Sequence, residues 1–154
     1  MESLRYLNLR HNKLSVLSDD VFLFLINLQK IDLSDNAITF LPSEMFTSMF
    51  FLTKVIVNDN FIELFDSDTF QDNKKLEEVH LWQNKIKAIR FDAKKMKNLS
   101  ILDVRGNVCI DELFYIQGNV TVTGIQNTIN QNCSSYVKLP GQLVYRLSRA
   151  FRRH

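Results

Sequence analysis

The sequence predicts an α/β-type solenoid with a parallel β-sheet on its concave face and an irregular convex side of 3₁₀ and short helical turns. Three observations support this prediction: asparagine returns at a nearly constant interval, apolar residues return in one frame around it, and phenylalanine returns with the same period. The asparagines are spaced by 24, 24, 24 and 23 residues: Asn12, Asn36, Asn60, Asn84 and Asn107. A fixed period of this length indicates stacked units that bury their apolar faces only against their neighbours.

Each asparagine lies in the same apolar pattern, which the second unit shows as Leu28, Ile31, Leu33, Asn36 and Ile38. This is L-x-x-L-x-L-x-x-N-x-L, the leucine-rich-repeat signature. The L-x-L alternation places two apolar side chains on one face of a short strand, so the units predict a horseshoe lined by a parallel sheet. The asparagine amide has both a donor and an acceptor. We therefore expect it to bond backbone groups where the chain leaves the strand, and not to bind a ligand.

The remainder of each repeat predicts the convex side. Phe22, Phe46 and Phe70 share the 24-residue period and are expected to form a buried aromatic column. The fourth repeat is one residue shorter and has Ala93 or Lys94 near this position, so we expect the column to end there.

The length is that of one domain with a continuous core, which we divide into three parts. Residues 1–108 are expected to form five repeats, residues 109–133 a carboxyl-terminal cap, and residues 134–154 a basic tail. Met1 stands three residues before Leu4, where later repeats have interior residues, and neither an amino-terminal cap nor a signal peptide precedes it. We therefore expect Met1 to be an internal methionine that follows a further repeat.

The two cysteines, Cys109 and Cys133, lie 24 residues apart in the expected cap. They could be two buried thiols, because cysteine packs as a small hydrophobe. We favour a disulfide that closes the cap over the open end of the core, with a stabilisation of about 3 kcal/mol. Two cysteines and three scattered histidines, His11, His80 and His154, do not predict a metal site.

Three N-x-[ST] tripeptides are consistent with export, and Asn119 in the cap is the expected glycosylation site. The five repeats and the cap sequence at 107–111, followed by one later cysteine, resemble extracellular leucine-rich-repeat proteins of animals. The cap is similar to that of secreted insect members, including immune ones, and departs from the four-cysteine cap of Toll-type and Slit-type ectodomains. The resemblance covers about residues 1–133 and implies a secreted, disulfide-bonded glycoprotein with a recognition role that includes innate immunity.

Binding is expected on the side chains that alternate with the buried leucines and face the concave sheet. Trp82 is the leading candidate, because it is the only tryptophan and large aromatic residues on sheet surfaces anchor protein interfaces. The alternative is that Trp82 packs across neighbouring strands and stabilises the sheet. The expected partner-binding residues are Tyr6, Lys30, Ile56, His80, Trp82, Asp103 and Arg105.

Charge and motif content argue against several function classes. The net charge is +2 at pH 7, but five basic and no acidic residues follow Cys133, so the part before them carries −3. No basic stripe is placed to follow a phosphate backbone, which disfavours nucleic acid as a partner. The pattern contains no nucleophile elbow or glycine-rich loop, and an open sheet has no enclosing pocket, so we expect no catalytic residues, no cofactor and no enzyme activity.

Four apolar residues of the tail return at helical spacing, with arginines between them: Leu139, Leu143, Leu147 and Phe151. Residues 139–154 could thus form an amphipathic basic helix for a helical partner or an anionic membrane, or a solvated end that folds back on the cap. For the whole chain we expect an extracellular module that recognises a protein, or a microbial glycan, through its concave face. The alternative is an intracellular scaffold or regulatory subunit with reduced cysteines.

Overall fold

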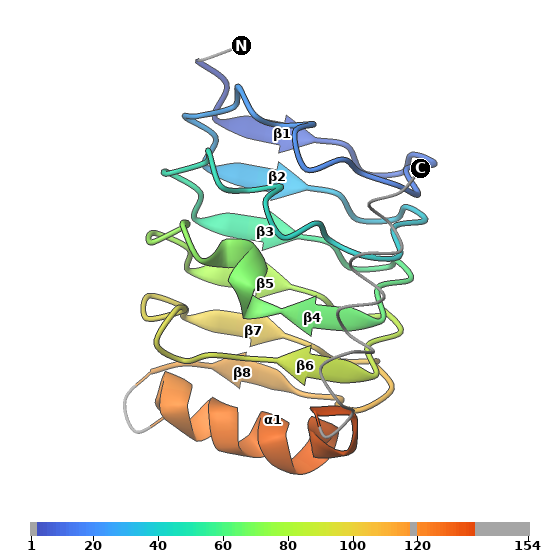
Figure 1. Cartoon of the computed structure of the whole chain (residues 1–154), viewed down its shortest axis with the longest axis vertical. Helices are drawn as coiled ribbons and strands as arrows, with labels where there is room; N and C mark the ends of the chain where they lie inside the picture. Colours follow the sequence, from blue (N-terminus) through green and yellow to red (C-terminus); the bar gives the residue numbers. More distant parts are fainter. Residues whose placement is uncertain (1–2, 118–119, 138–154) are drawn as a thin grey trace.

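The computed structural model describes residues 3–117 and 120–137, with side chains up to Cys133. Three of the expectations above fall outside these residues: the interior position of Met1, the glycosylation of Asn119 and the tail helix within 139–154. The described chain winds into a stack in which each repeat contributes one turn (Figure 1).

One wall of the stack is a six-stranded sheet with one strand from each repeat and one from the cap (Figure 1). Its strands, in order, are β1 (Tyr6–Asn8), β2 (Lys30–Asp32), β3 (Lys54–Ile56), β5 (Glu78–His80), β7 (Ile101–Asp103) and β8 (Leu113–Tyr115). The first five are parallel, and β8 pairs antiparallel with β7. The predicted leucine-rich-repeat solenoid with a parallel sheet is confirmed. The antiparallel β8 was not expected, because the repeat pattern ends before it.

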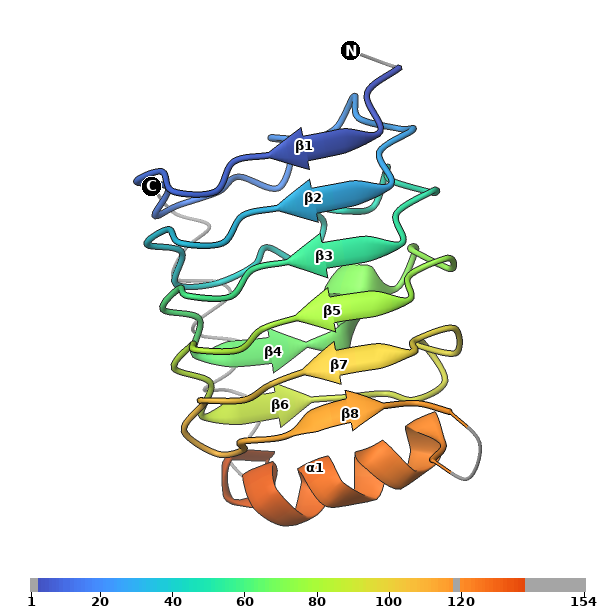
Figure 2. The same cartoon turned by 180° about the vertical axis from the view of Figure 1, so that it is seen from behind.

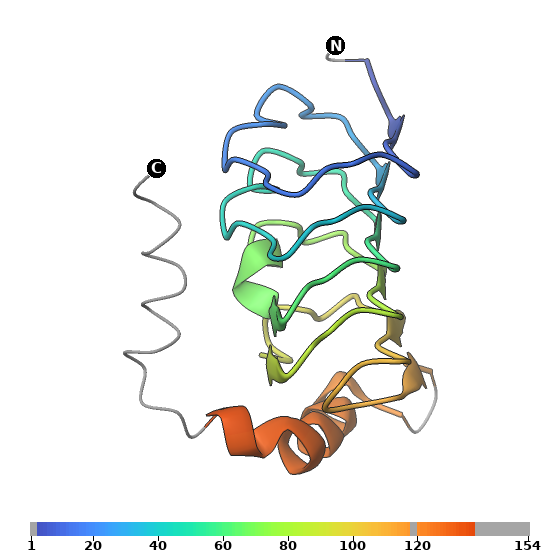
Figure 3. The same cartoon turned by 90° about the vertical axis from the view of Figure 1, so that its right-hand side faces the viewer.

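The opposite wall is less regular, as predicted for the convex side. Two short parallel strands, β4 (Leu64–Asp66) and β6 (Ala88–Arg90), and the 3₁₀ helix η1 (Ser67–Phe70) lie there. Figure 3 shows the main sheet and this wall on opposite sides of the coil. The carboxylate of Asp66 starts η1 by accepting a hydrogen bond of 3.0 Å from the backbone N–H of Asp68.

Apolar side chains of the repeat frame fill the space between the two walls. In the second repeat the whole frame is fully buried: Leu28, Ile31, Leu33 and Ile38. The predicted aromatic column is confirmed, since Phe22, Phe46 and Phe70 are buried and the last two rings stack with centroids 5.2 Å apart. In the fourth repeat Ala93 packs against the core near the place where the column was expected to end.

The repeated asparagines bond backbone groups of two repeats at once. The Oδ1 of Asn60 accepts the N–H of Ile38 in the preceding repeat at 2.9 Å. Its Nδ2 donates to the carbonyl of Leu33 in that repeat at 3.0 Å, and to those of Val57 and Asn58 in its own repeat at 3.1 Å. The same four bonds are made by Asn36, Asn84 and Asn107. We call this series, with Asn12, the asparagine ladder; its predicted structural role is confirmed.

The residue before each ladder asparagine has a left-handed backbone conformation, with φ between 53° and 65°: His11, Asp35, Asp59, Gln83 and Gly106. This conformation is uncommon outside glycine, and it bends the chain sharply after the strand. At Gly106 a Cβ atom would lie 2.5 Å from Nε2 of Gln83, so any larger residue would require the Gln83 side chain to move. The repeat spacing did not predict this backbone conformation.

The carboxyl-terminal end of the stack is covered by α1 (Val122–Val137), which packs against β6 (Figure 1). Ile125, Ile129 and Cys133 follow one another at intervals of four and bury one helix face against the core. The backbone of α1 continues past residue 133, where we expected the cap to end.

A disulfide joins Cys133 of α1 to Cys109, with 5.2 Å between the two Cα atoms. This is the interpretation that we favoured over two free thiols. Cys109 occupies the repeat position where earlier repeats have Leu14 or isoleucine, so the disulfide connects the last repeat frame to the covering helix.

Replacing Asn60 by alanine is expected to lower the free energy of unfolding by about 3 kcal/mol, because four backbone groups in the interior lose their partner. Asn12→Ala is the matched control. Asn12 is exposed and its amide donates to Leu9 and Arg10 of its own repeat, so the loss should stay below about 1 kcal/mol. Urea denaturation measures both values, and equal losses would contradict the role assigned to the ladder.

Replacing Cys109 and Cys133 together by serine is expected to lower the free energy of unfolding by about 3 kcal/mol, because the closed loop of 24 residues restricts the unfolded chain. Thermal melts with and without dithiothreitol provide the measurement. Reduction should lower the Tm of the unaltered chain and leave that of the double-serine variant unchanged. An unaltered Tm after complete reduction would show that the cap does not depend on the disulfide.

Candidate partner-binding face

The outward side chains of the main sheet form continuous columns, on the face turned toward the viewer in Figure 2. The strand register gives one column of Tyr6, Lys30, Lys54, Glu78, Ile101 and Tyr115. A second column is Asn8, Asp32, Ile56, His80, Asp103 and Leu113. Two residues beyond the strand ends, the repeat continues with Arg10, Ser34, Asn58, Trp82 and Arg105. Within the repeats, these are the columns that the spacing predicted.

Trp82 is half-buried and lies just beyond the end of β5. Its backbone carbonyl accepts the N–H of Asp59 at 3.1 Å and the amide of Asn84 at 3.4 Å, so the ladder holds the main chain beneath the indole. His80 is on the same strand and Ile56 is its register partner on β3. The structure thus brings together three of the predicted binding residues.

His80 belongs to a charged group at the centre of the face. The Nε2 of His80 lies 2.9 Å from Oε2 of Glu78, and the ammonium group of Lys54 bonds the same oxygen. Burial alone would raise the pKa of Glu78, but the hydrogen bonds with Lys54 and His80, together with the electrostatic attraction of these two groups, lower it below its ordinary value of 4.5. The three side chains therefore hold one another in place on the surface.

Asp103 and Arg105 form a second fixed pair. Arg105 donates from Nε to Oδ1 of Asp103 at 2.9 Å and from Nη2 to Oδ2 at 2.7 Å. The hydrogen bonds to Asp103 raise the pKa of the guanidinium group. Asp103 is only 3% exposed, whereas the Arg105 side chain is 54% exposed. Asp103 therefore offers almost no surface to a partner, and its carboxylate orients Arg105 instead.

The other predicted residues lie at the β1 end of the face. The ammonium group of Lys30 sits 4.9 Å above the ring of Tyr6, a cation–π contact. Sequence reasoning left Tyr115 out of the set. This side chain is 58% exposed and pairs with Ile101 across the antiparallel strands, so it extends the first column into the cap. The alternation in Leu113-Phe114-Tyr115 is the signal that could have identified it.

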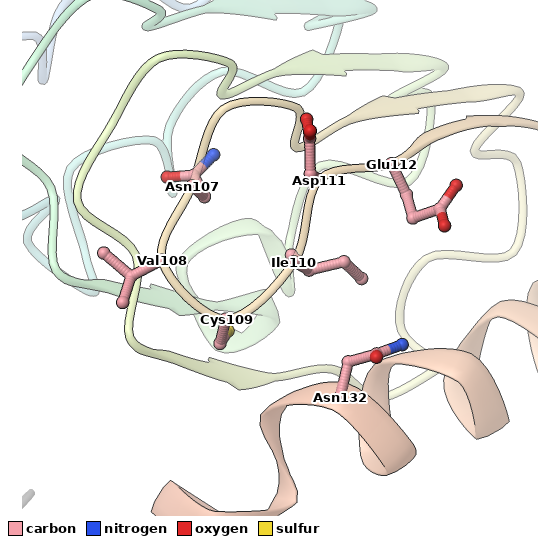
Figure 4. Close-up of a pocket in the computed structure, with 7 residues that line it drawn as sticks. All are labelled: Asn107, Val108, Cys109, Ile110, Asp111, Glu112 and Asn132. Atoms are coloured by element: carbon pink, nitrogen blue, oxygen red, sulfur yellow. The ribbon is translucent and has the colours of Figure 1, made fainter.

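Two concave regions lie away from this face. The first, of about 270 Å³, is beside the disulfide and is lined by residues Asn107, Val108, Cys109, Ile110, Asp111, Glu112 and Asn132 (Figure 4). In Figure 4 Asn132 projects from α1 toward the loop, whereas the carboxylate of Asp111 points away from the helix. Oδ1 of Asp111 accepts the N–H of Gly106 at 2.6 Å and so stabilises the loop. The second region, of about 410 Å³, lies between the convex strands and α1, where ion pairs join Lys95 to Asp68 and Arg90 to Asp66.

Among the residues that the structure describes, no three His, Cys, Asp or Glu side chains are grouped so that they could hold a metal ion. Nor does the described part contain a helix with the length and apolar character needed to cross a bilayer.

Fold and register define a repeat-built solenoid with an open sheet face. The leucine-rich-repeat family model matches residues 2–49, which contain the first two asparagine frames, those of Asn12 and Asn36. The described chain has the leucine-rich-repeat fold. A search among curated proteins gave no significant match.

Among solved structures, a chain in the Toll–Spatzle complex of Drosophila is 26% identical, with a TM-score of 0.58 over 62% of this chain and 13% of that chain. A leucine-rich-repeat protein of Leptospira interrogans is 30% identical, with a TM-score of 0.61 over 69% of this chain and 26% of that chain. The leucine-rich-repeat domain of APL1 is 21% identical, with a TM-score of 0.48 over 68% and 33% of the two chains. This chain therefore spans a third or less of the length of each of these proteins.

The lowered pKa of Glu78 predicts a pH-dependent stability. A carboxylate whose folded pKa is below its unfolded value contributes stability above the unfolded pKa, and loses it as the pH falls through the folded pKa. The Tm of the unaltered chain should exceed that of Glu78→Gln at neutral pH, and the two should converge as the pH falls below 4.5. Glu44→Gln, at an exposed convex position, is the control. Its Tm difference from the unaltered chain should not change with pH in this way. A Tm difference at Glu78 that is constant with pH would contradict the network.

Proposed function

We propose that this chain is an extracellular recognition module that binds a protein partner through the main sheet face. The observation that carries this proposal is the half-buried Trp82, two residues after His80, whose register partner is Ile56. A tryptophan that is partly held by its surroundings offers a large contact area at a low entropic cost, which is typical of residues that dominate binding energy.

The neighbours of Trp82 support binding rather than catalysis. Lys54 and His80 are both bonded to Glu78, and Arg105 is held by Asp103, so much of the polar surface is ordered before a partner arrives. Both charge signs are present on the face, which favours a protein surface of mixed charge over a uniformly charged polymer. Neither of the two concave regions in the described part of the chain is lined by these side chains, and we infer a non-enzymatic role.

The extracellular part of the proposal rests on the disulfide and on structural likeness. Disulfides persist in oxidising compartments and are rare in the cytosol, and both cysteines of this chain are paired. The solved Drosophila complex that resembles this chain is described as a hub in development and innate immunity. An immune or receptor-like role is the corresponding proposal for this chain.

An intracellular scaffold that uses the same face is the alternative. Native protein run on non-reducing and reducing gels distinguishes the two, because a 24-residue loop closed by Cys109 and Cys133 increases mobility only when it is oxidised. If an alkylating reagent modifies both cysteines of the native protein without prior reduction, the intracellular function is favoured.

Trp82→Ala is expected to weaken binding of the partner by at least about 2 kcal/mol, or roughly 30-fold, without a large change in Tm. The partner is first captured from an extract of the native compartment on immobilised chain. The affinity of the captured protein is then measured for the unaltered chain and for each variant. Phe61→Ala is the control, because Phe61 is 50% exposed but follows the ladder asparagine and lies off the sheet columns. If Trp82→Ala retains the partner as well as the unaltered chain does, the partner does not bind through the main sheet face. If the chain retains a glycan and no protein, the partner is a glycan and not a protein.

A further inference from the structure

A group of exposed apolar side chains lies on one side of the stack, away from the partner-binding columns. The segments that return from the convex wall to the strand starts run along this side, on the left of Figure 1. We call residues 22–27, 46–51, 70–75 and 94–98 the lateral edge. Its first two segments expose five large apolar side chains: Leu23, Phe24, Ile26, Phe50 and Phe51. Phe24 is 75% exposed and Phe50 is 59% exposed, so these are not incompletely buried core residues.

The repeat register aligns these apolar residues with lysines in the next two repeats. Ile26 and Phe50 hold the same position as Lys74 and Lys97, and Phe51 the same position as Lys75. The segments are stacked in this register, since the amide of Asn98 bonds the carbonyl of Lys74 at 2.6 Å. Direct contact across the register is visible where the ammonium group of Lys75 lies 4.3 Å from the ring centroid of Phe51.

The two columns formed by these positions contain three lysines and no carboxylate. All three, Lys74, Lys75 and Lys97, are exposed. Asp72 is the one acidic residue of the lateral edge and stands in the column of Phe24, whereas Glu77 lies outside the edge. Against Asp72 the edge contains five lysines: Lys74, Lys75, Lys94, Lys95 and Lys97. The lateral edge is thus apolar at the β2 and β3 level and positively charged at the β5 and β7 level.

The shape of the edge favours a soft surface over a folded partner. The phenylalanines project from turns, and neither of the two concave regions includes them. A folded partner would need a pocket for each ring, whereas the interfacial layer of a bilayer accepts phenylalanine, leucine and isoleucine without preformed pockets. Adjacent lysines then reach negatively charged headgroups with their ammonium groups while their aliphatic stems stay near the apolar layer.

We propose that the lateral edge docks on a phospholipid surface with anionic headgroups. Phe24, Phe50 and Phe51 enter the interfacial layer, and the lysines contact the headgroups. Trp82 lies beyond the end of β5, whereas the edge lies at the strand starts, so docking leaves the partner-binding face accessible. The inference is independent of the proposed recognition function, because it uses different residues.

Flotation of the full chain with phosphatidylcholine vesicles, with and without phosphatidylserine, tests the proposal. Binding should require phosphatidylserine, and Lys74→Glu/Lys75→Glu should reduce the partition coefficient at least about tenfold. Lys13→Glu/Lys85→Glu is the matched control: it makes the same change in net charge at exposed positions beyond the strand ends, and should keep most of the binding. Equal losses in the two variants would overturn the proposal, because they would show a response to net charge alone.

Insertion is measured separately with Phe50→Trp in a Trp82→Phe background, which leaves one tryptophan in the chain. Its emission should shift to shorter wavelength on anionic vesicles and be quenched by brominated phosphatidylcholine. An unshifted emission with saturating vesicles would overturn the proposal.

Two alternatives to this proposal, membrane binding by the tail and coverage of the edge by a second copy of the chain, would give different results. If replacing the tail arginines Arg146, Arg149, Arg152 and Arg153 by alanine abolishes flotation while Phe50→Ser/Phe51→Ser does not change it, the tail binds the membrane and the edge does not. If the chain dimerises in solution, and Phe50→Ser/Phe51→Ser abolishes the dimer without any vesicle binding by the parent, a second copy covers the edge. Either result refutes the proposal. The expected result is loss of flotation in Phe50→Ser/Phe51→Ser with an unchanged Tm.

Discussion

One side-chain amide couples each repeat to the one before it, and the rest of the solenoid depends on this bond set. At the turn after a strand, backbone N–H and carbonyl groups of two repeats point into the buried interior, where unpaired polar groups are costly. The amide of a ladder asparagine such as Asn60 satisfies four of them, and two of those belong to the preceding repeat. A repeat therefore completes its hydrogen bonds only when its neighbour is in place. The left-handed residue before each asparagine makes the turn sharp enough for the amide to reach inward.

Because the inward residues and the ladder hold the backbone, the outward residues are free to carry function. Their charges are nevertheless coupled across strands, as in the group of Lys54, Glu78 and His80, whose hydrogen bonds lower the pKa of Glu78. The consequence is a face whose polar groups are ordered around Trp82. A separate set of outward residues, on the lateral edge, combines phenylalanine with lysine and has a different chemistry from the face. One solenoid thus presents two surfaces of different chemistry.

The frame of the repeat also tolerates local departures. Asn73 occupies the position where other repeats have Leu25, Met49 or Met96, and it is buried. Its Nδ2 donates to the carbonyls of Phe46 and Met49 at 2.9 Å, while its Oδ1 makes no hydrogen bond among the described residues. At the carboxyl-terminal end the frame stops altogether. There the disulfide and one face of α1 replace the contacts that a further repeat would have made.

The sequence by itself determined the solenoid, the strand register, the aromatic column and the columns of outward residues. It could do so because the 24-residue period ties each position to a fixed depth in the stack, so that burial follows from spacing alone. The tertiary structure decided what the period does not encode. It paired β8 antiparallel to β7, set α1 over the open end, buried Asp103 beneath Arg105, and placed Tyr115 beside Ile101. These features depend on contacts outside the repeating frame, where the partner of a residue is set by side-chain geometry and not by its distance along the chain.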